Sequence, residues 1–447
     1  MNMTDGSIVD KLLIFALPIA ASSIVQLLFN AADLAVIGKF CGSDPLAAVG
    51  ANTFIITLII GLFVGLSVGS NAVISLKIGM GDLKSIEDCV HTSILTAIIS
   101  GIFLAVVGQF IAYPILAALS TPESIIDMAV TYFKIYFIGM PFIMLYNFCA
   151  AIMRSRGDTR RPLIILVISG IINVILNLIL VLVFNLGVAG VAIATTISGA
   201  ISAIILTALL CKEEYPFTLK LSKLRLNPSV LKMIAAVGIP AGMQGMLYSI
   251  SNTVIQSCMN ILGSDVVAAN SAALNYEYIV CYMFQAFSTA AMTFIAQNYG
   301  AGNIKRCQQI ALRVIVLNTI TIVAIGAVIY IFAYPMSLVF TSNPTVAELS
   351  EYRLRVLMAF TVVNSLIEII SGIMRGYGRS LSTVLISIIG ICGVRLTYSL
   401  VYFPNHQTFP DIMRVYPISW FITIIPLTIL LVAHMHSVKV RALKGQL

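Results

Sequence analysis

Three carboxylates lie well inside apolar stretches of this 447-residue chain: Asp33, Glu277 and Glu368. The neighbours of Asp33 are mostly Leu, Ile, Val, Ala and Phe, in a segment long enough to span a bilayer. An ionisable group in such a segment is costly to insert and marks an ion or substrate pathway. The competing interpretation is an aspartate near a helix end that only reaches interfacial water.

Other polar residues are expected at the depth of Asp33, in three further spans. Asn173 and Asn177 are one turn apart and therefore share a helix face. At about 1.5 Å per residue, Asn177 lies roughly 22 Å from the inner end of its span and Thr195 about 10 Å from the outer end of the next. Tyr132 lies near the outer end of another span. Asn and Thr alone more often join helices by hydrogen bonds, but an aspartate at the same level favours a proton or cation site.

The two glutamates belong to a surface in the second half that we expect to face a substrate. Glu277 lies about 16 Å inside its span, near the membrane midplane. Either Glu277 or Glu368 could instead pair with Arg395 in a neighbouring span. Methionine and aromatic side chains suit adaptable recognition of apolar cations, although in most helices they only pack. The expected substrate-lining residues are Glu277, Glu368, Met283, Phe287 and Tyr248.

Membrane spans must position these residues. The chain is 59% hydrophobic and 10% charged, with mean hydropathy +1.01, whereas soluble proteins carry roughly 25% charged residues. This composition excludes a soluble protein. Twelve spans are expected, at residues 12–38, 47–76, 93–118, 128–152, 162–185, 188–211, 230–262, 266–297, 309–340, 350–374, 380–403 and 415–438.

The basic residues are distributed unevenly between the two ends of these spans. Twenty lie in the termini and alternate loops, while the other side has Lys39, Arg353, Arg355 and Arg414. The positive-inside rule then predicts cytoplasmic termini, in a multi-pass protein of the cytoplasmic (inner) cell membrane. The net charge of +8 is explained by this bias, so no nucleic-acid partner is expected.

The polar stretch 212–229 divides the chain into halves that repeat each other. Gly79-Met80-Gly81-Asp82 matches Gly300-Ala301-Gly302-Asn303, and Ile152-Met153-Arg154 matches Ile373-Met374-Arg375, each at an offset of 221. We expect an N-terminal six-helix lobe at 1–211, a cytoplasmic linker at 212–229 and a C-terminal six-helix lobe at 230–447. The predicted fold is an all-α membrane protein of twelve helices, with two lobes related by a pseudo-two-fold axis along the membrane normal.

This architecture favours a transporter that works by alternating access. A channel would need a pore-lining ring of like groups, which we do not find. The repeat also offers an internal comparison, because Asp33, Asn173 and Asn177 correspond to Ile255, Val394 and Tyr398. The second half is therefore expected to lack the polar cluster of the first.

The sequence resembles the multidrug and toxic compound extrusion (MATE) family over nearly its whole length. The motifs that carry the resemblance are Asn30-Ala31-Ala32-Asp33, Arg154-Ser155-Arg156-Gly157-Asp158-Thr159, the stretch 186–195, Gln297-Asn298-Tyr299-Gly300-Ala301-Gly302-Asn303 and Met374-Arg375-Gly376-Tyr377-Gly378. The resemblance implies export of small amphipathic, often cationic compounds, driven by inward flow of H⁺ or Na⁺.

Within this family the chain is more similar to the DinF-like branch. That branch keeps its essential acid in the first span, here Asp33, and completes the site at positions that match Tyr132, Asn173, Asn177 and Thr195. Asn177 departs from the family pattern, which usually has Asp there. A Na⁺ ion at Asp33, Asn173, Asn177 and Thr195 would thus meet one formal negative charge, so H⁺ is favoured over Na⁺ as the coupling ion. Asn30 opens the motif and is included in the expected coupling site.

Two other functions stay open at the level of sequence. A flippase for lipid-linked precursors has a related architecture and would favour a cavity rich in Arg and Lys. A membrane enzyme would need clustered His or acidic residues at the membrane surface, which we do not find. We therefore expect a monomeric antiporter in the lipid bilayer, with a small amphipathic or cationic molecule as its partner, no cofactor besides the coupling ion and no enzyme activity.

Overall fold

The computed structural model describes residues 1–119 and 121–444, and these form helices joined by turns, with no strand in that part of the chain. The helices of the first half are α1 (Ile8–Phe40), α2 (Ser43–Met80), α3 (Leu83–Ala118), α4 (Glu123–Ile138), α5 (Met140–Ser155), α6 (Arg160–Leu178), η1 (Ile179–Val183) and α7 (Gly187–Cys211). After η2 (Leu221–Lys223) follow α8 (Pro228–Ile261), α9 (Ser264–Gly300), α10 (Ile304–Ile331), α11 (Ala333–Leu338), α12 (Pro344–Gly376), α13 (Ser380–Ser387), η3 (Ile388–Gly393), α14 (Val394–Thr397), η4 (Tyr398–Tyr402), η5 (Phe403–Asn405) and α15 (Phe409–Leu443).

Among the described residues, eleven helical segments are long and apolar enough to cross a membrane, or twelve if α4 and α5 form one bent span. This agrees with the twelve predicted spans. The bend between α4 and α5 is 46°. It occurs at Gly139, and Pro141 follows at the start of α5, where its missing N–H interrupts the helical hydrogen bonds. In the second half the equivalent residues, Phe360 and Val362, continue α12 without a break.

The backbone confirms the internal repeat predicted from the sequence. Glycines with positive φ occur at the same places in both halves, where only glycine adopts this conformation without strain. The pairs at an offset of 221 are Gly42 (95°) with Gly263 (107°), Gly81 (68°) with Gly302 (72°), and Gly157 (90°) with Gly378 (76°). The helix connections of the two halves are therefore built alike.

The chain divides into two compact packing units. Unit 1 comprises residues 1–2 and 21–242, and unit 2 comprises residues 3–20 and 243–447. Two long helices change unit part way along: α1 after Ala20 and α8 after Gly242. The lobe boundaries expected from the sequence stay a prediction, and the packing units differ from them at these two helix ends. Pro18 and Pro240 each lie two residues before the change, where proline removes a backbone hydrogen bond.

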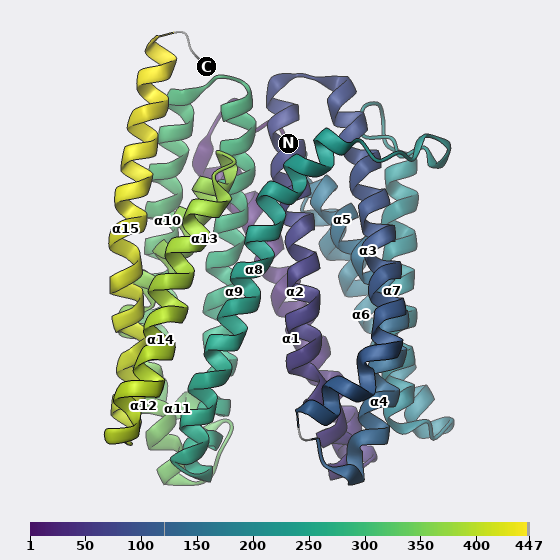
Figure 1. Cartoon of the computed structure of the whole chain (residues 1–447), viewed down its shortest axis with the longest axis vertical. Coiled ribbons are helices and arrows are strands. Elements are labelled where there is room, and N and C mark those ends of the chain that lie inside the picture. Colours follow the sequence, from purple (N-terminus) through teal and green to yellow (C-terminus); the bar gives the residue numbers. More distant parts are fainter. Residues whose placement is uncertain (120, 445–447) are drawn as a thin grey trace. The chain divides into compact units, whose positions relative to one another are not determined.

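In each unit, small residues allow two helices to pack closely against each other. In unit 1, a Cβ atom on Gly65 of α2 would lie 2.4 Å from the backbone of Gly242 in α8, a close approach typical of membrane helices with glycine four residues apart. In unit 2, α9 packs most extensively against α12, and a Cβ atom on Gly372 would lie 2.4 Å from Ser288 Oγ. Figure 1 shows α9, α12 and α15 of unit 2 as long helices of one bundle, coloured green to yellow.

Candidate ion-coupling site

Asp33 on α1 accepts hydrogen bonds from two other helices of unit 1. Asn177 Nδ2 on α6 donates to Asp33 Oδ1 at 2.5 Å. The single O–H of Thr195 on α7 is shared between Asp33 Oδ2 at 3.3 Å and the Val191 carbonyl at 3.0 Å. Asn177 Nδ2 also donates to Asn173 Oδ1 at 3.2 Å, and Asn173 Nδ2 donates to Thr195 Oγ1 at 3.4 Å. The structure thus brings together four of the residues predicted from the sequence.

A glycine on α6 allows this convergence. Gly170 lies one turn before Asn173, and Phe29 lies one turn before Asp33. A Cβ atom on Gly170 would lie 1.7 Å from the Phe29 ring. Any larger residue at 170 would therefore push α6 away from α1 and separate the amides from the carboxylate.

The hydrogen bonds of the cluster leave one acceptor unused. Asn173 and Asn177 are buried, with 5% and 0% of their surfaces exposed, whereas Asp33 is half-buried. Asn177 Oδ1 has no hydrogen-bond partner among the described residues. Because an unpaired buried carbonyl is costly, this oxygen is available to a cation or to the O–H of a protonated carboxyl group.

Two other predicted residues lie outside this hydrogen-bonded group. Tyr132 on α4 is buried and stacks on Tyr136, with ring centroids 5.9 Å apart, and the phenols of both interact electrostatically with the Asp33 carboxylate. Asn30 on α1 is exposed. In the part of the chain that the structure describes, no hydrogen bond joins Tyr132 or Asn30 to Asp33.

Both glutamates of the predicted substrate surface are paired with arginines. Arg353 on α12 donates from Nε to Glu277 Oε1 at 2.7 Å and from Nη2 to Glu277 Oε2 at 2.9 Å. Glu368 is paired with Arg375, which lies two turns later on the same helix. The expectation that one of them pairs with Arg395 is therefore wrong.

The burial of Arg353 was not predicted from the sequence, which counted this residue with the basic groups at the outer ends of the spans. Arg353 lies inside α12 with 1% of its surface exposed, and the two hydrogen bonds that it donates to Glu277 make this burial possible. Burial does not change its side, so Lys39, Arg353, Arg355 and Arg414 remain the basic residues expected on the outer side.

The apolar members of the predicted substrate surface pack in or against the core of unit 2. Phe287 is completely buried in this core, and Met283 and Tyr248 pack against it as partly buried residues. The Tyr248 hydroxyl accepts a hydrogen bond from Gln244 Nε2 at 3.1 Å. Their role in substrate contact stays a prediction.

Sequence reasoning missed a second polar cluster, in unit 2. Arg395 on α14 donates from Nη1 to Asn252 Oδ1 at 2.8 Å and from Nε to Ser419 Oγ at 3.2 Å. The Tyr416 ring lies between two guanidinium groups, 4.7 Å from Arg395 Cζ and 5.2 Å from Arg353 Cζ. We call this group, together with Glu277, the arginine cluster.

The repeat contained the signal for this cluster. At the same offsets, Asn30, Tyr132 and Thr195 of the first half correspond to Asn252, Arg353 and Tyr416 of the second half. The second half does lack the cluster of Asp33, Asn173 and Asn177, but the expectation did not foresee that it carries a different polar cluster. It considered only the equivalents of Asp33, Asn173 and Asn177, and these are the positions where the second half is not charged.

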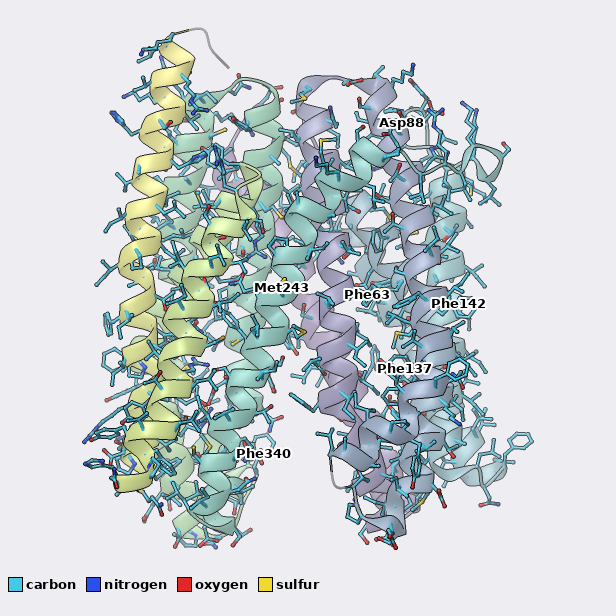
Figure 2. The ribbon with its side chains drawn as sticks, viewed as in Figure 1. Phe63, Asp88, Phe137, Phe142, Met243 and Phe340 are labelled. Carbon is cyan, nitrogen blue, oxygen red and sulfur yellow. The ribbon has the colours of Figure 1, made fainter. Side chains whose placement is uncertain are left out.

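Ion pairs attach the segment between α7 and α8 to the rest of unit 1. Glu213 binds Arg156 at 2.6 Å and also binds Arg161. Burial opposes ionisation of Glu213, but the hydrogen bonds and charges of the two arginines outweigh it and hold its pKa below the usual value. Asp88, labelled in Figure 2 near one end of α3, pairs with Arg225 and accepts from Asn227 Nδ2 at 3.2 Å.

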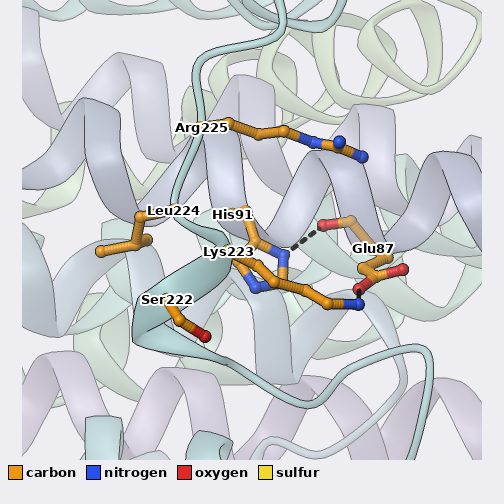
Figure 3. A pocket seen from close by; sticks show the side chains of 6 residues that line it. All are labelled: Glu87, His91, Ser222, Lys223, Leu224 and Arg225. Carbon is orange, nitrogen blue, oxygen red and sulfur yellow. Dashed lines mark hydrogen bonds and ion pairs between the residues drawn. The ribbon is translucent and has the colours of Figure 1, made fainter.

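A pocket of about 350 Å³ lies beneath this segment, lined by Glu87, His91, Ser222, Lys223, Leu224 and Arg225. Figure 3 shows its two polar contacts, from His91 Nδ1 to the Glu87 carbonyl at 2.8 Å and from Lys223 Nζ to Glu87 Oε1 at 2.8 Å. The charged groups are thus engaged in holding the segment on α3, and we assign the pocket no function.

A family model described as MatE matches this chain twice, over residues 18–179 and 240–401. The two matches are offset by 222 residues, which agrees with the internal repeat. Together they cover well over half of the chain.

Individual proteins resemble the chain over most of its length. It is 27% identical over 403 residues to a probable multidrug resistance protein, YpnP of Bacillus subtilis, covering 90% of each chain. It is 27% identical over 390 residues to an FAD transporter of Shewanella oneidensis, covering 84% of each. A solved structure described as the outward-facing conformation of a multidrug resistance MATE family transporter matches with a TM-score of 0.89, at 21% identity and 98% coverage of both chains. At this identity, the structural match establishes the fold alone.

Proposed function

Since the chain belongs to the MatE family of membrane transporters, we propose that it is a cation-coupled antiporter that exports small amphipathic compounds by alternating access. The observation that carries the proposal is the convergence of Asn177 and Thr195 on the carboxylate of Asp33. An acid inside a span, held only by neutral groups, can change its charge when it binds a proton or a cation. The resemblance of the sequence to the DinF-like branch supports the same role for Asp33.

The hydrogen bonds around Asp33 support H⁺ over Na⁺ as the coupling ion. Asn177 and Thr195 direct N–H and O–H donors at the carboxylate, an arrangement that stabilises the ionised form without a metal. Na⁺ would need oxygen ligands, so the Asn177 amide would have to turn its Oδ1 toward the ion. A protonated Asp33 needs only one acceptor for its O–H. The unpaired Asn177 Oδ1 provides this acceptor once the Asn177 amide has rotated in the same way.

Protonation of Asp33 would then rearrange the contacts between three helices. In the ionised state α6 and α7 donate to α1, and in the protonated state Asp33 becomes a donor itself. A ligand shifts a conformational equilibrium only through its different affinity for the two states. The changed hydrogen bonds at Asp33 supply such a difference, and outward and inward states would therefore bind the proton unequally.

The proposed substrate class rests on the names of relatives and on the charge of the predicted substrate surface. Several relatives of this chain are named as multidrug resistance proteins, whereas one is named as a transporter of FAD, which is an anion. The expectation of cationic substrates rested partly on Glu277, and this carboxylate is neutralised by Arg353. The proposal therefore specifies amphipathic compounds and gives Glu277 no part in attracting cations.

The alternative, a flippase for lipid-linked precursors, finds less support. Recognition of a pyrophosphate group would favour several basic side chains in one cavity. Of the two arginines in the arginine cluster, Arg353 is bound to Glu277 and only Arg395 lacks a carboxylate partner among the described residues. The family match also favours an exporter.

The experiment is efflux from proteoliposomes loaded with cationic and anionic dyes, under an imposed pH gradient or an imposed Na⁺ gradient, each alone. We expect the pH gradient to drive uphill export and Asp33→Asn to abolish it, while dye binding in detergent stays within about two-fold. A response to Na⁺ alone would contradict the proton assignment. Uphill export by Asp33→Asn would contradict the role of Asp33 altogether.

The location and topology follow from the charge bias. We propose a monomer in the cytoplasmic membrane with the segment 212–229 and both termini in the cytoplasm, because basic residues gather on that side. Reporter fusions in 212–229 and next to Ser264 should be found on opposite sides of the membrane. The same sidedness at both places would overturn the topology.

A further inference from the structure

Arg395 is a buried cation without a carboxylate partner. Only 6% of its surface is exposed. Its hydrogen bonds go to the neutral oxygens of Asn252 and Ser419. Among the described residues, the nearby carboxylates Glu277 and Glu368 form their ion pairs with other arginines.

The charges of the arginine cluster do not balance. Glu277 cancels the charge of Arg353 through two parallel hydrogen bonds, so Arg395 leaves one net positive charge inside a membrane-spanning segment. Such a charge is costly unless an opposite charge or a functional ligand accompanies it. The contact with the Tyr416 ring and the two neutral acceptors offset only part of this cost.

Unused hydrogen-bond donors occur close to Arg395 in the chain. A guanidinium group carries five N–H donors, and hydrogen bonds to described residues involve only Nη1 and Nε of Arg395. Ser399 Oγ, four residues after Arg395, and Trp420 Nε1, next to Ser419, are both buried and have no partner in the described parts of the chain. Ser399 and Trp420 are thus neighbours in sequence of Arg395 and of its partner Ser419, and an anion would satisfy both unpaired donors and an uncompensated cation.

The cluster can be reached through Asn252. This residue is exposed, and its Oδ1 accepts from Nη1 of Arg395. A carboxylate or phosphate oxygen could take the place of this amide oxygen and would bring the missing negative charge. Such a charge-assisted hydrogen bond is shorter and stronger than one to a neutral amide.

We propose that unit 2 contains a binding site for organic anions, in which a carboxylate or phosphate group binds Arg395 and displaces the side chain of Asn252. Tyr416 and Arg353 form the adjoining wall, and the Glu277–Arg353 pair keeps this wall neutral. Three members of the site, Asn252, Arg353 and Tyr416, lie at positions that the repeat makes equivalent to Asn30, Tyr132 and Thr195 of unit 1, whereas Arg395 corresponds to Val174. The inference builds on the proposed function, because it names the class of substrate that this transporter takes.

The single tryptophan of the chain makes a direct binding measurement possible. Trp420 is the only tryptophan, and its ring centroid lies 6.1 Å from that of Tyr416. The full-length protein in detergent is titrated with FMN and with riboflavin, which share one ring system and differ by a phosphate. We expect FMN to quench Trp420 fluorescence at concentrations about ten- to a hundred-fold lower than riboflavin does. This is the gain in affinity that one hydrogen bond to a charged group provides. Naphthalene-2-carboxylate and naphthalene-2-methanol test a carboxylate in the same way.

Variants decide whether Arg395 is responsible. Arg395→Gln should weaken FMN binding about ten- to a hundred-fold and leave riboflavin unchanged, and Arg395→Lys should restore part of the affinity. Arg355→Gln is the matched control, because Arg355 is exposed and pairs with Glu351 on the surface of α12. This control should keep the affinity for FMN.

Three results would overturn the proposal: equal affinity of the wild-type protein for the charged and neutral members of both pairs, unchanged FMN affinity in Arg395→Gln, or an equal loss in Arg355→Gln. The first needs no variant and decides the matter even if Arg395→Gln does not fold. All titrations are made without an ion gradient. The titrations therefore test anion binding alone, and a protein that does not couple transport to Asp33 would still give the expected titration. Failure of the proposed function would appear only in the efflux experiment.

Discussion

The two units carry polar clusters of opposite net charge that share only some of the positions made equivalent by the internal repeat. Unit 1 has Asp33 where unit 2 has Ile255, whereas unit 2 has Arg353 and Tyr416 where unit 1 has Tyr132 and Thr195. The connections that build the two units are alike, down to the glycines with positive φ. Substitutions at a few positions have therefore changed the sign of the charge on a conserved helical framework, which shows that the function lies in the site and not in the fold.

The two clusters also differ in whether their acid can change its charge. Asp33 is held by an amide and a hydroxyl, both neutral. Glu277 is held by two hydrogen bonds from the completely buried guanidinium of Arg353. Neutralising Glu277 with a proton would leave Arg353 as an uncompensated buried charge, whereas neutralising Asp33 leaves no such charge. This comparison supports the proposal that Asp33, and not Glu277, is the coupling acid.

The largest effect is expected when the ion pair of unit 2 is broken on one side. Arg353→Met leaves Glu277 without its counter-charge, which should destabilise the protein by about 3–5 kcal/mol. Combining Arg353→Met with Glu277→Gln should recover a large part of this loss. Thermal unfolding in detergent, followed by Trp420 fluorescence, measures both variants.

The control for this prediction is the exposed pair between Arg355 and Glu351 on the same helix. Arg355→Met should cost less than about 1 kcal/mol, because exposed ion pairs contribute little. If Arg353→Met and Arg355→Met lowered the unfolding temperature equally, Glu277 would not be a fixed ion-pair partner. The contrast with Asp33 would then disappear.

An intermediate effect is expected when unit 1 receives a second acid. In Asn177→Asp, two carboxylates would lie at hydrogen-bond distance, since Asn177 Nδ2 is 2.5 Å from Asp33 Oδ1. They cannot both stay ionised without a cation or a shared proton between them. We therefore expect this variant to bind Na⁺ roughly ten-fold more tightly than the wild type, which corresponds to about 1.4 kcal/mol, and to export under a Na⁺ gradient that does not drive the wild type. Efflux under a Na⁺ gradient alone measures this change.

The matched change in unit 2 is Asn275→Asp on α9, whose amide, among the described residues, donates to the Ser271 carbonyl within its own helix. This variant should leave the Na⁺ dependence as it is in the wild type. Transport by Asn177→Asp that still ignores Na⁺ would mean that this residue does not contact the coupling ion.

Much of the architecture could be predicted from the sequence because its causes are local. Apolar stretches of span length give the helices, and the repeated motifs give the two halves. The grouping of Asp33, Asn173, Asn177 and Thr195 was also predictable, since helical rise places them at one depth.

The failures concern contacts that depth alone cannot determine. Arg353 was assigned to the outer end of its span, because a lone arginine near a span end usually reaches the interface. Its actual burial depends on Glu277, which lies on another helix and 76 residues away. The sequence likewise did not predict that α1 and α8 change packing unit just after Pro18 and Pro240. The pattern of residues along one helix does not identify the helices against which it packs.

The smallest effect is expected from removing one hydroxyl in each unit. Thr195→Val keeps the shape of the side chain but removes the donor to Asp33 Oδ2, and one lost hydrogen bond is worth about 1 kcal/mol. We therefore expect a change of roughly five-fold in the coupling-ion concentration for half-maximal transport. Tyr416→Phe, at the equivalent position, keeps the ring between the two guanidinium groups and should not change that concentration. Equal changes in both variants would show that the coupling ion depends on unit 2 as much as on unit 1, and the division of roles between the two clusters would have to be given up.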